Sequence, residues 1–174
     1  MNKENTFKNS CRETADKLII QCQDRSARSN LRQLLMGIPE VQSKALRYLK
    51  NIPRPSYSNQ WELLFLIAGL IAEYPCPLPD KPISFGTSLY KIAQDPEIKS
   101  TGIERRLESL LELERSSLTQ PLHSLVLQAR KPKITIDYGT LMYELSCWDS
   151  PDKWIQLSWA KDFWCPREDA QEET

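Results

Sequence analysis

Three arginines near the N-terminus have the type and spacing to bind phosphate. Arg25, Arg28 and Arg32 recur at i, i+3 and i+7, so a helix through this stretch would present all three guanidinium groups on one face, opposite a leucine stripe. A guanidinium stays charged and binds phosphate oxygens through paired hydrogen bonds. The row therefore predicts a surface that holds a polyanion by its backbone without reading a base sequence.

Other basic residues are candidates for the same surface. The helix expected after Pro39 adds Lys44, Arg47 and Lys50 on its outer face. The later candidates are Lys91, Arg105, Arg106, Arg130, Lys131 and Lys133. None of them is interleaved with exposed aromatic residues that could stack bases, so contacts with backbone phosphates are expected.

The formal charge of zero hides an uneven distribution. Residues 1–58 hold eleven Lys and Arg against five Asp and Glu, a net charge of +6, whereas residues 136–174 hold three against nine, a net charge of −6. A one-sided basic stretch suits a polyanionic partner, but an ordinary solvated helical face accounts for the same pattern equally well.

Signals of catalysis are nearly absent. The sequence contains no GxGxxG, GxxxxGK[ST], HExxH or GxSxG motif. Its single histidine, His123, could activate a cysteine or serine, but it lies among leucines in an expected helix, where packing is its more common role. Glu104 and Glu108 lie on one helix face beside two arginines, which makes acid–base work there less favoured still. We therefore predict a protein without enzyme activity, cofactor or metal.

The cysteines and the apolar runs indicate a cytoplasmic protein. The five cysteines are widely spaced, include no CxxC pair and are accompanied by one histidine, so they suggest neither a disulfide framework nor a zinc site. The polar start of the chain excludes a secretory signal, and the longest apolar run, 63–72, is too short to span a bilayer. We expect no membrane contact.

Apolar periodicity predicts an all-α fold of about eight helices that positions the basic residues. Asp24 should cap the helix with the arginine row, which Gly37 ends, and Asp137 should cap a later helix. Residues 61–74 are apolar nearly all round and should form the central buried helix. The expected core residues are Trp61, Leu64, Leu107, Leu110, Leu141, Trp148, Trp159 and Phe163.

Two further helix starts follow from local signals. Thr101 and Glu104 form a T-x-x-E capping box for the helix through residue 113. The run 150–152, Ser-Pro-Asp, supplies a cap, a first-turn proline and an acidic residue for the last helix, which Cys165 and Pro166 end. The aromatic residues of this last helix, from Trp154 onward, are expected to fix it in the core.

The chain is expected to form two small helical lobes. The Pro-rich segment 75–82 is the best connector between them, although the short helix after it could pack on the first lobe. The predicted organisation is a flexible leader over 1–10, an N-terminal lobe over 11–94, a C-terminal lobe over 95–166 and a disordered acidic tail over 167–174.

Six sequence blocks, in this order and spacing, resemble the CasB family. They are DRSARSNLRQ (24–33), ALRYL (45–49), SFGTSLYKIA (84–93), ERRLESLLE (104–112), IDYGTLMYELSCWDSPD (136–152) and WAKDFW (159–164). CasB is the small subunit of the type I-E CRISPR surveillance complex, Cascade. The likeness extends from Asp24 to Trp164, and its last block together with ERRLESLLE is the most specific part.

The resemblance implies a non-enzymatic, all-helical subunit of two small lobes, present as two copies in the complex. Its partners would be the guide-RNA-coating backbone subunits, the large subunit, the crRNA and the target DNA. Guide pairing would supply sequence specificity, while the basic surface would stabilise the R-loop strands. The alternative is a helical protein–protein adaptor without direct nucleic-acid contact.

The resemblance also assigns residues. Arg25, Arg28 and Arg32 match the basic first block, Lys91 matches the basic position after the SFG motif, and Arg105 and Arg106 match the ERR pair. The ERR arginines could instead pair with Glu108 and Glu112 or hold a subunit contact. Where the family often has further arginines, this chain has Ser124, Leu125, Tyr143 and Glu144, which implies a thinner DNA surface.

The arginine row is expected to be a binding face only. Exposed arginines opposite an apolar stripe contribute little to folding, so their replacement by Ala should leave the thermal midpoint nearly unmoved.

Overall fold

The structure is a computed structural model that describes residues 3–166. Within that range the chain forms nine α-helices and three short 3-10 helices and no strand, which confirms the all-α prediction of about eight helices. The N-terminal elements are α1 (Lys3–Gln21), α2 (Arg25–Arg32), η1 (Gln33–Met36), α3 (Pro39–Ala45), η2 (Leu46–Tyr48) and α4 (Ser58–Glu73). The later elements are α5 (Phe85–Ala93), α6 (Ser100–Leu111), η3 (Arg115–Ser117), α7 (Thr119–Ala129), α8 (Tyr138–Ser146) and α9 (Trp154–Trp164). None of the helices over 3–166 is long and apolar enough to cross a membrane.

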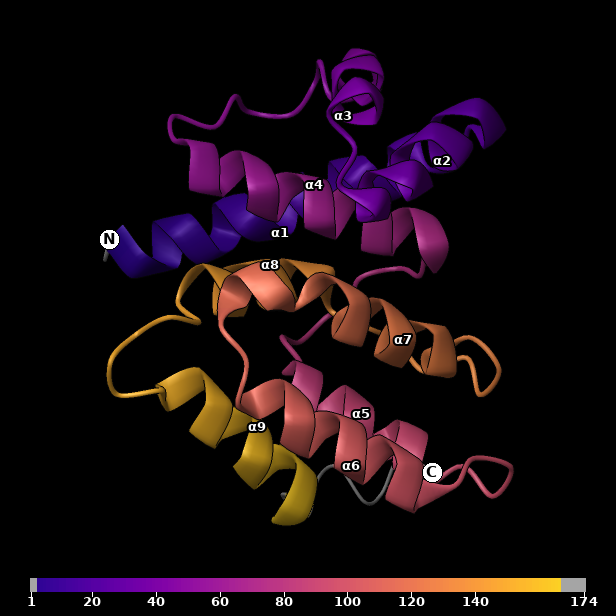
Figure 1. The fold of residues 1–174 in the computed structure, drawn as a ribbon, viewed down its shortest axis with the longest axis vertical. Helices are drawn as coiled ribbons and strands as arrows, with labels where there is room; N and C mark the ends of the chain where they lie inside the picture. The colour runs from indigo at the N-terminus through magenta and orange to yellow at the C-terminus, as the bar shows by residue number, and fades with distance from the viewer. Residues whose placement is uncertain (1–2, 167–174) are drawn as a thin grey trace.

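The helices lie in stacked layers, with α7 and α8 in the middle (Figure 1). Helices α1 to α4 form one outer group, and α5, α6 and α9 form the other. Helix α8 packs on α1 and α4, while α7 contacts α4 on one side and both α5 and α6 on the other. The two groups therefore share one continuous apolar core across the middle layer.

Helix α4 is the buried centre of the first group, as the sequence predicts. Ten of its residues are buried, and it contacts α1, α2, η1, α7 and α8. Its close approach to η1 depends on Gly69, because a Cβ there would lie 2.7 Å from the Leu35 side chain.

Helix α5 packs with the later helices rather than with the N-terminal group to which the sequence analysis assigned it. It contacts α6, α7 and most extensively α9. Gly86 permits the α9 contact, because a Cβ at this position would lie 2.5 Å from the backbone oxygen of Trp159. The exact division into two lobes stays a prediction.

Aromatic residues build the core of the second group. The rings of Trp148 and Trp159 lie 4.9 Å apart between centroids, and those of Phe85 and Trp159 lie 5.0 Å apart. Seven of the eight expected core residues are buried, whereas Trp61, at the start of α4, is only half-buried. The aromatic residues of the last helix divide between core and surface, and Trp159 and Phe163 are buried as predicted. Trp154 and Trp164 are 39% and 41% exposed, because α9 packs mainly through the face that carries Trp159.

Three helix boundaries follow the local sequence signals. The backbone N–H of Ala27 donates to Asp24 Oδ1 at 2.6 Å, and that of Thr140 donates to Asp137 Oδ1 at 2.9 Å. Gly37 ends η1 with φ of +66°, a conformation that glycine adopts without steric cost.

Two other predicted starts are wrong. Helix α6 begins at Ser100, which places Thr101 inside the first turn, and Glu104 accepts a hydrogen bond from Trp164 Nε1 at 2.9 Å instead of closing a capping box. Helix α9 begins only at Trp154, because residues 150–153 form a turn closed by a 2.9 Å hydrogen bond from the Lys153 N–H to the Ser150 oxygen.

The predicted flexible leader is also wrong for residues 3–10, which form the first half of α1. Packing on α8 compensates for their polar sequence. The Phe7 and Tyr143 ring centroids lie 6.1 Å apart, and the Tyr143 hydroxyl donates to Glu4 Oε1 at 2.9 Å. The predicted acidic tail, 167–174, lies outside the described residues.

Candidate nucleic-acid interface

Helix α2 holds its three arginines in three different environments. Buried Ala27 and Leu31 fix the helix on α4 and leave Arg25 exposed to solvent. Arg28 turns inward, and its Nε donates to the backbone oxygen of Ala72 at 2.9 Å. A cation on the last carbonyl groups of α4 satisfies acceptors that the helix leaves open and complements its dipole. Arg28 is therefore a structural cap of α4.

The third arginine, Arg32, joins a cluster around the buried carboxylate of Glu73. Its Nε lies 3.2 Å from Glu73 Oε2, and Nη1 of Arg130 lies 3.3 Å from Glu73 Oε1. Nε2 of His123 is 3.5 Å from Oε2, although the angles there do not make a hydrogen bond. Three elements thus meet at one carboxylate: α2, the C-terminal end of α4, and α7 with the residue that follows it.

The cluster brings together two basic segments that are far apart in the sequence. Helix α2 and the C-terminal ends of α4 and α7 lie along the same side of the molecule (Figure 1). We call this side the basic edge, and its residues are Arg25, Arg28, Arg32, Arg130, Lys131 and Lys133. Because Glu73 neutralises one positive charge of the six, the edge keeps an excess of positive charge in a fixed arrangement.

The two lysines of the edge differ in their freedom. Lys131 pairs with Glu97 of the α5–α6 connection, and this hydrogen bond raises the pKa of Lys131 and lowers that of Glu97. Both side chains are exposed, so solvent screens their attraction. Lys133 is exposed in a left-handed conformation with φ of +57° and makes no ion pair with any residue over 3–166.

The remaining predicted site residues lie outside the cluster. Arg105 and Arg106 are exposed on α6, and neither forms an ion pair with Glu108 or Glu112 in the described range, so the intrahelical pairing considered from the sequence is absent there. Lys91 lies half-buried in the last turn of α5. Among residues 3–166, neither Arg105 nor Arg106 forms an ion pair with Glu73.

The contacts of His123 do not support the alternative in which this histidine activates a cysteine. His123 faces Glu73, and none of its hydrogen bonds or ion pairs within the described range involves a cysteine. Burial raises the pKa of the Cys11 thiol to about 12 and that of Cys22 to about 11, which disfavours the reactive thiolate. Residues 3–166 also contain no group of three His, Cys, Asp or Glu side chains that could hold a metal.

At four positions the CasB family often has arginine and this chain has another residue, and three of these four residues are buried. Leu125 is fully buried, and Tyr143 and Glu144 are nearly so. The Glu144 carboxylate accepts a hydrogen bond from Trp159 Nε1 at 2.8 Å, and burial raises its pKa to about 8. These three side chains therefore belong to the interior of the molecule, and the thinner DNA surface stays a prediction.

Sequence reasoning missed Glu73, although a signal for it exists. It is an acidic residue at the C-terminal end of the most apolar helix, where the helix dipole disfavours negative charge. A buried carboxylate in such a place needs cationic partners from other elements. The sequence could therefore have predicted partners for Glu73, but not which ones.

Comparison with known proteins gives a consistent result. A family model described as CRISPR-associated protein Cse2 matches residues 27–164. The CRISPR-associated protein Cse2 of Thermus thermophilus is 25% identical over 141 residues, which cover 80% of this chain and 79% of that protein. The fold is similar to that of CasB from Thermus thermophilus, with a TM-score of 0.69 and 21% identity over 95% of this chain and 99% of that one.

A chain of a CRISPR RNA-guided surveillance complex is similar as well, with a TM-score of 0.70 and 21% identity over 97% of both chains. The family match covers most of the molecule, including the arginine row, the buried Glu73 and the aromatic core. The chain therefore belongs to the Cse2 family of CRISPR-associated proteins, in agreement with the CasB resemblance of its sequence blocks.

Proposed function

We propose that the chain is the non-catalytic small subunit of a type I-E CRISPR Cascade complex in the cytoplasm. Its family membership and its structural likeness to a chain of a CRISPR RNA-guided surveillance complex support this assignment. The proposed partners are the guide-RNA-coating backbone subunits, the large subunit, the crRNA and the target DNA, with two copies of this chain in each complex. Its task is to hold the backbone of R-loop strands without reading their sequence.

The observation that carries the proposal is the meeting of two distant basic segments at Glu73. Arg32 and Arg130 both reach this carboxylate, and their side chains remain 46% and 50% exposed. A phosphate can therefore approach each guanidinium from the solvent side while Glu73 keeps it in place. Fixed, partly exposed arginines lose little conformational freedom on binding, which favours a backbone contact.

The residues of the basic edge contribute unequally in this proposal. Arg25 and Lys133 are exposed and unpaired within 3–166, so they bind phosphate at full charge. The charges of Arg32 and Arg130 are partly neutralised by their ion pairs with Glu73. Arg28 is instead engaged in a hydrogen bond to the end of α4. Lys91, Arg105 and Arg106 form a second proposed group, carried by α5 and α6.

The test is R-loop stability in the assembled complex. The chain is coexpressed with the other subunits and a guide, and R-loop lifetime is measured at two salt concentrations for the parent and for the double variant Arg25→Ala, Lys133→Ala. Each lost phosphate contact lowers the log–log salt slope by about 0.7–0.9, so we expect a decrease of roughly 1.5 and a shorter lifetime. Guide sequence preference should not change.

A matched control is Lys161→Ala, which removes one exposed cation from α9 on the other side of the core. Its slope should stay at the parent value. A double variant that assembles normally and keeps the parent lifetime would move the nucleic-acid contact away from the basic edge. Failed assembly would instead favour the adaptor alternative, which the exposed Trp154, Leu157 and Trp164 of α9 also support.

A further inference from the structure

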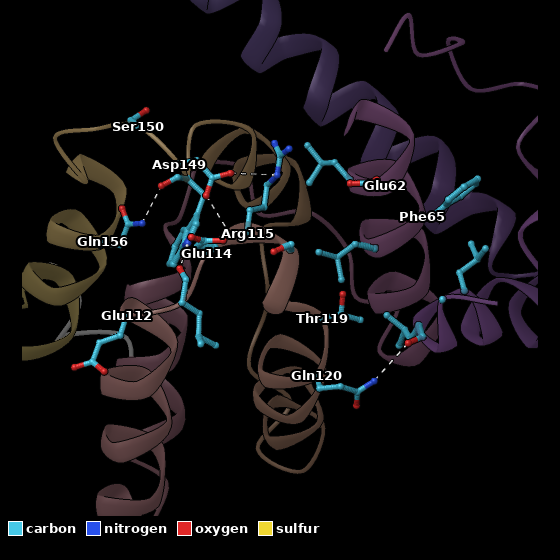
Figure 2. Close-up of a pocket in the computed structure, with 18 of the residues that line it drawn as sticks. Glu62, Phe65, Glu112, Glu114, Arg115, Thr119, Gln120, Asp149, Ser150 and Gln156 are labelled. Atoms are coloured by element: carbon cyan, nitrogen blue, oxygen red, sulfur yellow. Dashed lines mark hydrogen bonds and ion pairs between the residues drawn. The ribbon is translucent and has the colours of Figure 1, made fainter. Parts of the chain in front are cut away.

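A groove of about 900 Å³ lies on the molecule between α4 and the second helical group. Figure 2 shows η1 and the first half of α4, with Glu62, on one side, and the end of α6 and the turn before α9, with Asp149 and Ser150, on the other. The η3 segment and the start of α7, with Thr119 and Gln120, lie between these walls.

The charge of the groove is opposite to that of the basic edge. Its lining contains four carboxylates, those of Glu62, Glu112, Glu114 and Asp149, against two cations, those of Arg115 and Lys153. Arg115 is already engaged, because its Nε lies 3.8 Å from Asp149 Oδ2 and its backbone N–H donates to Asp149 Oδ1 at 3.1 Å. The other three carboxylates make no ion pair in the described part of the chain, so the groove presents uncompensated negative charge.

The groove also offers apolar surface. Leu66, Leu113 and Trp148 contribute apolar lining between the charged groups. Gln156 of the same wall is only 7% exposed, and its Nε2 donates to the Trp148 oxygen at 2.8 Å, which holds the turn before α9 in place.

We infer that the groove binds an extended segment of another protein subunit of the complex, in which Lys or Arg residues flank apolar side chains. This inference rests on the proposed function, because it places the chain in a multisubunit assembly. Charge complementarity selects the occupant: basic side chains meet the carboxylates, and apolar side chains cover Trp148.

The same charge disfavours two other occupants. A nucleic-acid strand would bring phosphates against three unpaired carboxylates. A second copy of this chain that inserted its basic edge would remove that edge from nucleic acid, which conflicts with the proposed function. A different subunit has neither cost.

Zero-length carbodiimide coupling tests the inference directly. The complex is assembled with its guide, treated with a carbodiimide that joins carboxylates to contacting lysines, digested and analysed by mass spectrometry, with half of the copies of this chain isotopically labelled. We expect links from Glu62, Glu112 or Glu114 to a lysine of a different subunit. Links only to a second copy would overturn the inference, as would an absence of links from the three residues together with normal incorporation of the charge-reversal variants described next.

Charge reversal provides the second readout. Glu62→Lys and Glu114→Lys, on facing walls of the groove, should each reduce incorporation of the chain into the complex at least several-fold, and more at low than at high salt. Glu108→Lys, an exposed residue of α6 outside the lining, is the matched control and should incorporate normally. Circular dichroism and the thermal midpoint verify that each variant is folded.

The outcomes separate this inference from the proposed function. If the parent copurifies with the guide and the other subunits while the groove variants incorporate as well as Glu108→Lys does, the groove has another role and the proposed function stands. If the parent itself fails to copurify with guide RNA and CRISPR subunits, the proposed function is wrong and the inference falls with it.

Discussion

Two glutamates, Glu73 and Glu144, are almost equally buried and are stabilised in opposite ways. Glu73 is 7% exposed and Glu144 is 6% exposed. Two arginines and a histidine surround Glu73 at the end of α4. Over residues 3–166, Glu144 has only neutral donors, the indole N–H of Trp159 at 2.8 Å and the backbone N–H of Phe85 at 3.5 Å.

The difference shows how position decides the way in which a buried carboxylate is tolerated. Glu73 lies where three elements end, so arginine side chains reach it while parts of their guanidinium groups remain in water. Glu144 lies beside the packed rings of Phe85 and Trp159, and burial raises its pKa to about 8. The first arrangement exposes a charged surface, whereas the second produces a neutral, rigid core near neutral pH.

The largest expected effect comes from breaking the aromatic environment of Glu144. Trp159→Ala removes a fully buried ring and the shortest hydrogen bond to the Glu144 carboxylate. Large-to-small changes of this kind cost about 3–5 kcal/mol in the free energy of unfolding, which urea denaturation would measure. Trp164→Ala, on the same helix but 41% exposed, is the matched control and should cost less than about 1.5 kcal/mol.

The next effect is a dependence of stability on pH. Because the folded-state pKa of Glu144 is raised from 4.5 to about 8, the folded protein holds a proton that the unfolded chain has released. The stability contribution is complete below the unfolded pKa and is lost as the pH rises through the folded value, at no more than about 1.4 kcal/mol per pH unit. Denaturant unfolding at several pH values between 6 and 9 would measure it.

The variant Glu144→Gln isolates this contribution. Its amide oxygen still accepts from Trp159, but the group no longer titrates. We expect the variant to lose less stability than the parent between pH 6 and pH 9 and to be the more stable protein at the alkaline end. An identical pH slope in both proteins would show that Glu144 does not hold the proton.

A smaller effect should distinguish the arginines of α2. Arg28→Ala removes the guanidinium cap from the last carbonyl groups of α4 and should cost about 1–2 kcal/mol, a decrease in thermal midpoint of roughly 2–8 °C. Arg25→Ala, an exposed residue one turn earlier on the same helix, should stay within about 0.5 kcal/mol of the parent. Equal thermal midpoints for both variants would mean that Arg28 stabilises the fold no more than the exposed Arg25 does.

The smallest effect concerns nucleic-acid binding and uses Glu73. Glu73→Gln removes the charge that Arg32 and Arg130 now share, so both guanidinium groups, which phosphate can approach from the solvent side, act at full charge. The salt slope of DNA binding should steepen by about 0.7–0.9 for each added contact, measured by fluorescence anisotropy over a salt series. Glu62→Gln, an exposed residue at the other end of α4, removes the same charge away from the basic edge and should change the slope less.

The α2 result corrects an expectation drawn from the sequence. The helical spacing of Arg25, Arg28 and Arg32 is real, and all three lie on α2 as predicted. Their surroundings differ, because Arg28 donates to the end of α4 and Arg32 pairs with Glu73, and their shared phosphate-binding role stays a prediction. A triple replacement would therefore lower the thermal midpoint, contrary to the prediction that it would stay unmoved.

The local signals succeeded where a residue acts on its own neighbours. Asp24 and Asp137 cap their helices as predicted, and the apolar run of α4 is buried, because these outcomes depend on residues within one or two turns. The capping box at Thr101 failed because Trp164, distant in sequence, hydrogen-bonds the glutamate it required. Residues 3–10 became helical because α8 packs against them.

The sequence by itself determined the all-α class, the helix that is buried at the centre, most of the core residues and the surplus of basic residues in the first third of the chain. Only the tertiary structure decided which of those cations are free, that α2 and α7 meet at Glu73, and that an acidic groove opens on another part of the surface. The physical reason is the separation along the chain of the residues on which each feature depends. Helix formation and capping depend on neighbours along the chain, whereas ion pairs, grooves and the protonation of a buried carboxylate depend on elements brought together by packing.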